Sequence, residues 1–297
     1  MTLDEIREAL RAAGLERLAD VAERLTLPAI RIELAMVDED TIPVGASKLG
    51  GRPDLPPDFV WPEWKGVGLT SLAQFRLSDL IVYDVERLLP SKGVLYFFYE
   101  VVTQPWGMEP TDRGAWQVVF YDGVISTLER TSSPFPTDPT RSPAPHQLDY
   151  TTILTVPNFT LVEHFTDIHM SEEETDRYMD FKSAYGGLRH QVLGHAHQIQ
   201  SPMQLWCELG LAGRWFSEIF QQTERRLTPE GERLEAKAIE DWRLLLQLDS
   251  IETATPAAFG YPWVVEWGLG GMLYFYIRKD DLAQWRFSDV WLQLQTT

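Results

Sequence analysis

The chain has 297 residues, of which 44% are hydrophobic, and a formal net charge of −18. This composition supplies a packed core and excludes a chain that is disordered throughout. Because binding to nucleic acid backbones and to anionic lipid depends on Lys and Arg, the negative charge disfavours both as direct ligands. The charge serves either solubility or attraction to a basic protein partner, and the sequence leaves both open.

Features that would target or cross-link the chain are missing from the sequence. No stretch approaches the roughly 20 apolar residues of a membrane helix. The first residues, from Met1 to Glu8, lack a basic region followed by an apolar one, so we expect no signal peptide. The single cysteine, Cys207, cannot form an intramolecular disulfide and does not permit a cysteine-rich zinc site. We therefore expect a cytoplasmic protein without a cofactor.

The first segment predicts an amphipathic helix over residues 2–26, an appendage to the rest of the chain. Thr2 and Glu5 form a capping box, and apolar residues then recur near a 3.6-residue period up to Pro28. Alternation of apolar and polar residues over 30–36 predicts a strand with one buried face.

The next part of the chain combines an irregular loop with predicted strands. Residues 47–66 contain four prolines and three glycines, which predict an ordered, turn-rich loop. Strands are predicted at 69–76, 93–102 and 116–121, with a hairpin turn at Asp122-Gly123. The Pro-rich segment 132–147 is a linker or a surface loop, and we favour the loop.

The remaining sequence mixes strands with two helices. One helix is predicted from Ser171, which forms a capping box with Glu174, to the pair Gly186-Gly187, and a second from Thr228 to about Asp241. Antiparallel strands with a few helices predict an α+β fold. The strands predicted here are 151–156, 159–163, 203–209, 242–249, 271–278 and 290–295.

One pair of strands occurs twice in the chain. Residues 93–98 read GVLYFF and residues 271–276 read GMLYFY, and each is preceded by an apolar strand that contains a glutamine, Gln74 or Gln247. This self-similarity predicts internally duplicated antiparallel β units. We expect related halves at about 29–130 and 150–297 within one domain that spans 1–297.

Together these segments resemble the YwqG-like family, a bacterial group with a domain of unknown function. The resemblance implies an α+β fold with an internal repeat, and it brings no established activity, cofactor or catalytic residue. Some members of such families look like immunity proteins of bacterial toxin systems. The chain departs from the family pattern at Gly194-His195-Ala-His197 and at Trp267-Gly268-Leu-Gly270-Gly271. The matching residues, spread over about 29–297, are Ser47-Lys48-Leu-Gly50-Gly51-x-Pro53-x-Leu-Pro56, Trp61-Pro62, Leu72-Ala-Gln74, Leu89-Pro90-x-x-Gly93-x-Leu95-Tyr96-Phe97-Phe98, His190-x-x-Leu193-Gly194 with Gln200, Trp242-Arg-Leu-Leu-Leu-Gln247-Leu-Asp249-Ser250 and Gly271-x-Leu-Tyr274-Phe275.

Sequence motifs for catalysis are weak. His190, His195 and His197 could hold zinc together with a carboxylate, but their spacing matches no standard signature, so hydrogen-bonded or exposed histidines are the favoured interpretation. The sequence has no Gly-x-Ser-x-Gly elbow and no phosphate-binding loop. Cys207 lies in an apolar segment and is expected to be inert. We therefore name no catalytic residue and no metal site.

Two glutamines in apolar strands are the sharpest candidates for binding. Buried amides must be hydrogen-bonded, so Gln74 and Gln247 either fasten a neighbouring loop, such as the one that carries Lys48, or line a ligand cleft between the repeats. Asp249 could do either, and Trp61 completes the set of candidate binding residues.

Two functions follow from these observations. The first is a non-catalytic protein that binds a basic protein partner, as an immunity protein does. The second is a small-molecule or sugar-type binding protein or hydrolase with a cleft near Trp61, Gln74 and Gln247.

Overall fold

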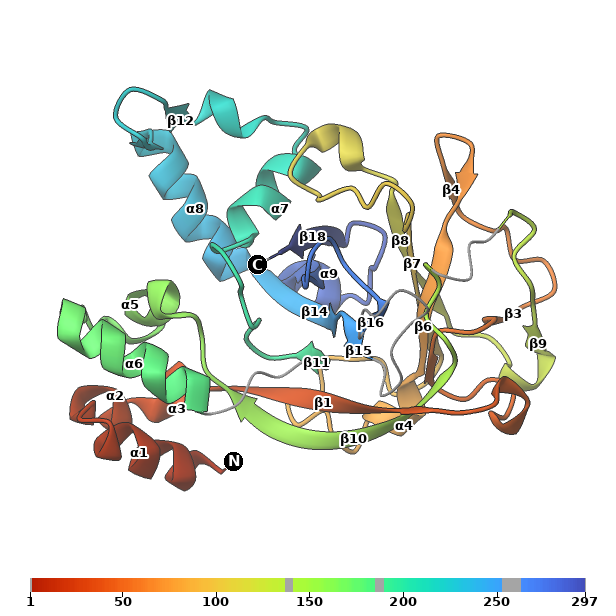
Figure 1. Cartoon of the computed structure of the whole chain (residues 1–297), viewed down its shortest axis with the longest axis horizontal. Coiled ribbons are helices and arrows are strands. Elements are labelled where there is room, and N and C mark those ends of the chain that lie inside the picture. The colour runs from red at the N-terminus through yellow and green to blue at the C-terminus, as the bar shows by residue number, and fades with distance from the viewer. Residues whose placement is uncertain (1, 137–140, 185–189, 253–262, 297) are drawn as a thin grey trace.

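A ten-stranded antiparallel sheet forms the centre of the molecule (Figure 1). The structure is a computed structural model, and it describes residues 2–136, 141–184, 190–252 and 263–296. Helices flank the sheet, so the fold is α+β, as the sequence predicts. Across the sheet, the order is β18 (Trp291–Gln295), β17 (Met272–Arg278), β14 (Trp242–Asp249), β11 (Gln191–Leu193), β1 (Leu27–Met36), β10 (His146–Thr155), β2 (Lys48–Leu49), β6 (Thr70–Arg76), β7 (Val94–Tyr99) and β8 (Trp116–Tyr121).

Short helices and two-stranded sheets complete the fold. In the part of the chain that the structure describes, no helix has both the length and the apolar character needed to cross a bilayer. The small sheets pair β3 (Asp54–Leu55) with β9 (Glu129–Arg130), β4 (Glu63–Trp64) with β5 (Val67–Gly68), β12 (Phe220–Gln221) with β13 (Arg226–Leu227), and β15 (Ile251–Glu252) with β16 (Trp263–Val265). The α-helices are α1 (Leu3–Ala12), α2 (Glu16–Asp20), α3 (Ala22–Leu25), α4 (Leu77–Leu80), α5 (Val162–Thr166), α6 (Glu172–Ala184), α7 (Gln204–Leu211), α8 (Pro229–Asp241) and α9 (Lys279–Ala283). Short 3₁₀ turns are η1 (Glu39–Thr41), η2 (Pro110–Asp112), η3 (Ile125–Thr127), η4 (Phe159–Leu161) and η5 (Phe216–Glu218).

The internal duplication is visible in the register of the strands. Gln74 of β6 faces Tyr96 of β7 in the first half, and Gln247 of β14 faces Tyr274 of β17 in the second. Both β6 and β14 carry a register shift shortly before this glutamine. Because a bulge changes the direction and twist of a strand, its presence in both copies gives the two halves the same local shape.

The two halves exchange the long strands β1 and β10 at the centre of the sheet. β1 and β10 pair along their whole length, and each belongs to a different half. β2 of the first half pairs with β10. β11 of the second half pairs with β1 (Figure 1). β1 therefore lies between two strands of the second half, and β10 lies between two strands of the first half.

The sheet curves so that its two ends pack against each other. Phe97 of β7 and Phe275 of β17 have ring centroids 5.1 Å apart, although their strands lie near opposite ends of the sheet order. Trp116 of β8 and Trp291 of β18 meet in the same way, with centroids 4.8 Å apart. Aromatic burial of this kind is among the largest contributions to a core, so the enclosed face holds the halves together.

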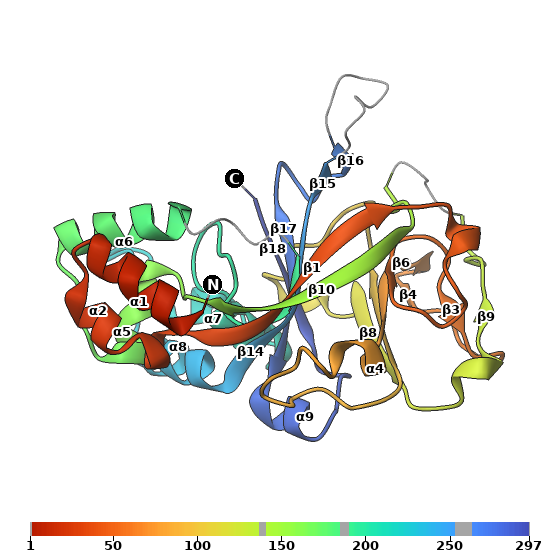
Figure 2. The same cartoon turned by 90° about the horizontal axis from the view of Figure 1, so that it is seen from below.

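A second apolar cluster lies beyond the end of the β1–β10 pair. The helices α1, α2 and α3 pack there against α5 and α6, and Leu10, Leu25 and Tyr178 are fully buried between them (Figure 2). The N-terminal segment is thus anchored to helices that follow β10.

The single N-terminal helix predicted over residues 2–26 is divided into three. The capping box of Thr2 and Glu5 is present, but α1 ends at Ala12 because Gly14 has a φ of +70°. The period of the apolar residues persists across this break, which is why the sequence pattern alone does not reveal it.

Three other predictions of secondary structure are wrong. Residues 203–209 form most of helix α7 and not a strand, and residues 159–163 form η4 and the start of α5. Short apolar runs fit a buried helix as well as a strand, so tertiary packing decides between them. The hairpin expected at Asp122-Gly123 leads instead into η3. Gly186-Gly187, the expected end of α6, lies outside the described residues.

Candidate functional site

Lys48 and Gln74 lie in a buried cluster around the carboxylate of Asp54, which is 0% exposed. Lys48 Nζ is 3.3 Å and Arg130 Nε is 2.9 Å from Asp54 Oδ1. The other carboxylate oxygen accepts hydrogen bonds from the Gly45 amide at 2.9 Å and from Gln74 Nε2 at 2.8 Å. Two cations and two amides therefore surround one buried anion.

The electrostatics of this cluster favour a fixed ion pair. Burial alone raises the pKa of Asp54, yet hydrogen bonds from Arg130 and Gly45 and the charge of Lys48 together lower it. Gln74 also accepts the Asp54 amide hydrogen at 2.7 Å, so it binds both the side chain and the backbone of that residue. Gln74 also donates to the Ala46 carbonyl at 2.7 Å, so it fastens the segments on both sides of β2 to the sheet.

Gln247 fastens the corresponding loop of the second half. Its Oε1 accepts from the His197 amide at 2.8 Å, which matches the bond from the Asp54 amide to Gln74. Tyr274 donates to the carbonyl of His197 at 2.6 Å. Asp249 is buried nearby, where its amide donates to Nδ1 of His190 at 3.2 Å.

Trp61, Gln74 and Gln247 do not meet in one cleft. Trp61 donates to the Leu69 carbonyl at 2.8 Å and packs edge-on against Phe98 at 5.6 Å. Gln74 and Gln247 lie on β6 and β14, with β11, β1, β10 and β2 between them in the sheet. These side chains do not line the pocket around His195, nor two further hollows formed by the described residues.

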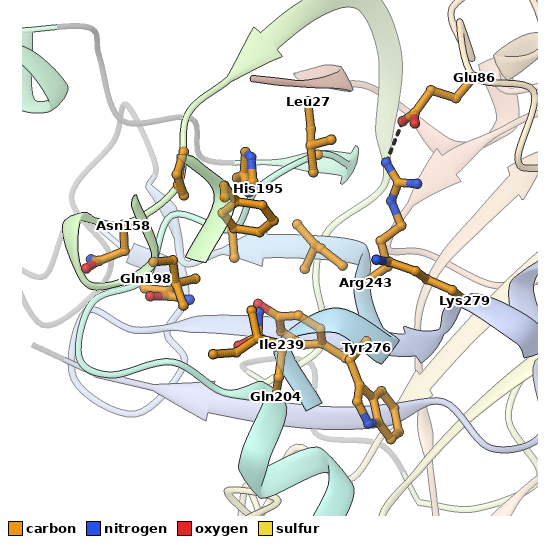
Figure 3. Close-up of a pocket in the computed structure, with 17 residues that line it drawn as sticks. Leu27, Glu86, Asn158, His195, Gln198, Gln204, Ile239, Arg243, Tyr276 and Lys279 are labelled. Carbon is orange, nitrogen blue, oxygen red and sulfur yellow. Dashed lines mark hydrogen bonds and ion pairs between the residues drawn. The ribbon is translucent and has the colours of Figure 1, made fainter. Parts of the chain in front are cut away.

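The best-formed pocket lies instead between helices and the start of β14, with a cavity volume of about 120 Å³. Six parts of the chain form it: the start of β1, Glu86, the 157–165 segment, the 194–204 segment, α8 with β14, and the end of β17 with α9. Its apolar wall includes Phe165 and Leu244. Figure 3 shows His195 and Tyr276 in its centre, with Gln198 and Asn158 on one side.

His195 is the central polar side chain of this pocket. Its ring packs edge-on against Phe165 at 4.8 Å, and its Nε2 has no hydrogen-bond partner among the described residues. Burial lowers the pKa of His195 to about 3, the charges of Lys182 and Arg243 act in the same direction, and a hydrogen bond to the Leu25 backbone opposes them. The ring is therefore neutral near pH 7. Since the Leu25 bond uses the other nitrogen as donor, Nε2 is left as an acceptor.

Gln198 supplies a second acceptor beside Tyr276. It is 7% exposed, and its side chain hydrogen-bonds the Tyr276 hydroxyl. Within the described part of the chain its Oε1 has no partner, so its amide nitrogen makes that bond. Burial also raises the pKa of Tyr276 well above its usual range, which keeps the phenol protonated.

Positive charge dominates one side of the pocket. Arg243 and Lys279 lie there together, across the pocket from Gln198 and Asn158 (Figure 3). Arg243 pairs with Glu86 at 2.5 Å through its NH2 group, while its buried Nε has no partner among the residues described. An unsatisfied buried donor or acceptor costs about 1–3 kcal/mol, so three such atoms around one pocket are an unusual concentration.

Most residues of this pocket were not predicted from the sequence. Sequence patterns identified His195 only as part of a histidine triplet and did not identify Gln198, Arg243, Tyr276 or Lys279. Arg243 offers one signal, since it is a charged residue inside the apolar strand Trp242–Asp249. The others carry no local signal, because their proximity arises from tertiary structure.

Metal and nucleophilic chemistry find little support in the described residues. No group of three His, Cys, Asp or Glu side chains is placed to hold a metal ion there. His190 and His197 take part in the loop contacts of Asp249 and Gln247, away from His195 in the pocket. Cys207 is buried in α7, and burial raises the pKa of its thiol well above the usual value.

Comparison with models of known protein families shows the family of this chain. A family model described as a domain of unknown function, DUF1963, matches residues 47–296. The chain belongs to this family. The match spans the repeated strand pairs and every residue that lines the pocket except Leu27, and it leaves out the N-terminal helices and β1. A search of curated proteins found no match to the chain.

Proposed function

We propose that this member of the DUF1963 family is a non-catalytic binding protein that takes a small polar molecule in the pocket around His195. The observation that carries the proposal is a set of buried polar atoms around one pocket that have no partner among the described residues: His195 Nε2, Gln198 Oε1 and Arg243 Nε. A mostly apolar cavity with a few polar groups that converge is the usual form of a small-molecule site.

Binding is favoured over catalysis by the chemistry of His195. With a pKa near 3 it is a poor general base at neutral pH, because efficient bases have a pKa close to the working pH. Its Nε2 also has no carboxylate or hydroxyl partner within the described residues, so the arrangement of a nucleophile activated by an oriented histidine is not formed.

A fragment screen tests this proposal. Polar molecules small enough for the cavity are added to protein with ¹³C-labelled methyl groups, and methyl resonances are followed by NMR. We expect hits to shift the signals of Leu161, Ala196 and Leu244, which line the pocket. His195→Phe and Gln198→Leu should each weaken binding at least about tenfold, since each removes a hydrogen-bond partner.

The matched control is His169→Phe, because His169 is exposed and lies outside the pocket lining. Its binding should equal that of the native protein, and circular dichroism should report an intact fold for all three variants. Hits that shift only resonances elsewhere, or an absence of hits, contradict the proposal.

A basic protein partner is the second candidate function, and the distribution of charge favours it. α6 and α8 each carry five acidic residues against two basic ones, and both helices lie at the same end of the molecule (Figures 1 and 2). An acidic surface of this kind accelerates encounter with a basic protein. The partner would be a basic toxin if the protein acts as an immunity protein.

A pull-down at two salt concentrations tests the second candidate. Retention of a basic partner should fall at raised salt, because exposed charges are screened beyond about 8–10 Å. Retention that does not change with salt, or no retention, contradicts it. A toxin gene beside the gene for this protein would support the immunity role.

Two finer assignments accompany these proposals. We propose that, within the DUF1963 family, the chain is YwqG-like, on the strength of the repeated strand motif and the Lys48–Gly51 turn. We also propose that it acts in the cytoplasm, which is compatible with its single cysteine.

A further inference from the structure

We infer that the ligand of the His195 pocket is a small hydroxycarboxylate, held by its carboxylate at Arg243 and Lys279 and by its hydroxyl at His195 and Gln198. This inference rests on the proposed binding function and specifies the chemical class of the ligand. It follows from the charge on one side of the pocket, the acceptors on the other, and the volume between them.

The carboxylate is assigned from charge. Arg243 and Lys279 line the same side of the pocket, and Glu86 is the single acidic residue among the lining side chains. Lys182, which donates to the carbonyl of the lining residue Pro157 at 3.1 Å, adds a further cation nearby. In a chain of net charge −18, a pocket with excess positive charge selects for an anion. The unpartnered Nε of Arg243 supplies a charge-assisted hydrogen bond for it.

The hydroxyl is assigned from the two acceptors. His195 Nε2 and Gln198 Oε1 both need a donor, and a carboxylate offers none. An ammonium group would supply donors, but the cations that lower the pKa of His195 would repel it from this position. An uncharged hydroxyl satisfies the acceptors without that repulsion.

The size of the ligand is limited by the cavity. Its volume of about 120 Å³ is close to that of a cavity that admits one benzene molecule, roughly 150 Å³. The ligand therefore has about five to six non-hydrogen atoms inside the pocket. Lactate has the required groups within this size.

Three probes of nearly equal size separate the two assignments. Sodium lactate, sodium propionate and propane-1,2-diol are titrated into the native protein at constant sodium concentration, and Kd is measured from methyl shifts. Lactate should bind about tenfold more tightly than propionate, which leaves the acceptors unpaired. It should also bind about tenfold more tightly than the diol, which lacks the charge.

Two lysine variants test the position of the carboxylate. Lys279→Gln should reduce the preference for lactate over the diol severalfold. Lys237→Gln, on α8 in a neighbouring hollow that also includes Lys279, should leave that preference unchanged. Both lysines are exposed, so neither change should disturb the fold.

The outcomes distinguish this inference from the function on which it rests. If the diol or propionate binds as tightly as lactate, or if Lys237→Gln acts like Lys279→Gln, the hydroxycarboxylate is overturned while small-molecule binding stands. If none of the three probes binds but the fragment screen finds other pocket ligands, the assignment of the ligand as a hydroxycarboxylate is again wrong. If the screen also finds none, the proposed function fails with it.

Discussion

At the scale of single residues, buried polar side chains are of two kinds. In one kind every polar atom has a hydrogen-bond partner within the fold, and in the other an atom lacks such a partner among the described residues. Asp54, Lys48 and Gln74 form a closed set in which each group has a partner. His195 and Gln198 each keep a buried atom without one among the described residues. Because an unpaired buried group is costly, the closed set stabilises structure and the open set indicates a place for a ligand.

Asp54→Ala should be strongly destabilising. It leaves the cations of Lys48 and Arg130 without their shared anion, and breaking a buried pair in this way costs about 3–5 kcal/mol. Urea unfolding at pH 7 measures the loss. Asp40→Ala is the control, since its 3.7 Å pair with Arg52 is exposed and should contribute less than about 1 kcal/mol. Equal losses in the two variants would contradict the role assigned to the cluster.

At the scale of elements, each half uses the same turn after its short strand, β2 in the first half and β11 in the second. Gly50 and Gly51 follow β2 with φ values of +72° and +68°, and Leu193 and Gly194 end β11 with +62° and +76°. Two successive left-handed residues reverse the chain and bring the amide of Asp54 or His197 to its glutamine. The sequence shows this turn clearly only in the first half, where both residues are glycine.

Gly50→Ala should destabilise the fold far more than an alanine at another left-handed glycine. A Cβ at Gly50 would lie 2.2 Å from the carbonyl oxygen of Ala144 and 2.3 Å from that of Pro143, so the backbone must move. At Gly213, with a φ of +70°, a Cβ meets no atom within 4 Å. Gly213→Ala should therefore lower the free energy of unfolding by only about 1–2 kcal/mol, the cost of a left-handed backbone for alanine. Gly50→Ala should lower it clearly more, because the steric clash is added. The comparison is made by urea unfolding, and similar costs would exclude a steric requirement at Gly50.

At the scale of the whole molecule, the exchange of β1 and β10 makes the halves interdependent. Each half borrows a strand, and the aromatic contacts of Phe97 with Phe275 and of Trp116 with Trp291 connect the ends of the sheet. We therefore propose that the chain folds as a single domain.

A single unfolding transition is expected from this arrangement. Tryptophan fluorescence and far-UV circular dichroism should give coincident urea curves, because neither half can keep its sheet when the other unfolds. The Asp54→Ala change in the first half should shift both curves together. Two separated transitions would instead indicate independent halves.

The sequence by itself determined the fold class, the duplication and most of the strands of the sheet. These features depend on local sequence: the spacing of apolar residues predicts the strands, and a recurring motif reveals the duplication. They can therefore be identified without knowing which segments are in contact. The same local signals failed for residues 203–209, where a short apolar run suits either helix or strand. They also could not decide whether Gln74 and Gln247 face a loop or a ligand.

Only the tertiary structure decided which strands are exchanged and where the candidate site lies. The pocket joins residues from Leu27 to Lys279, and its electrostatics come from Lys182 and Arg243 acting on a buried His195. Burial, proximity of charge and the lack of a hydrogen-bond partner depend on neighbours that are distant in sequence. For that reason the strand motif could be recognised from the chain, whereas the site required the fold.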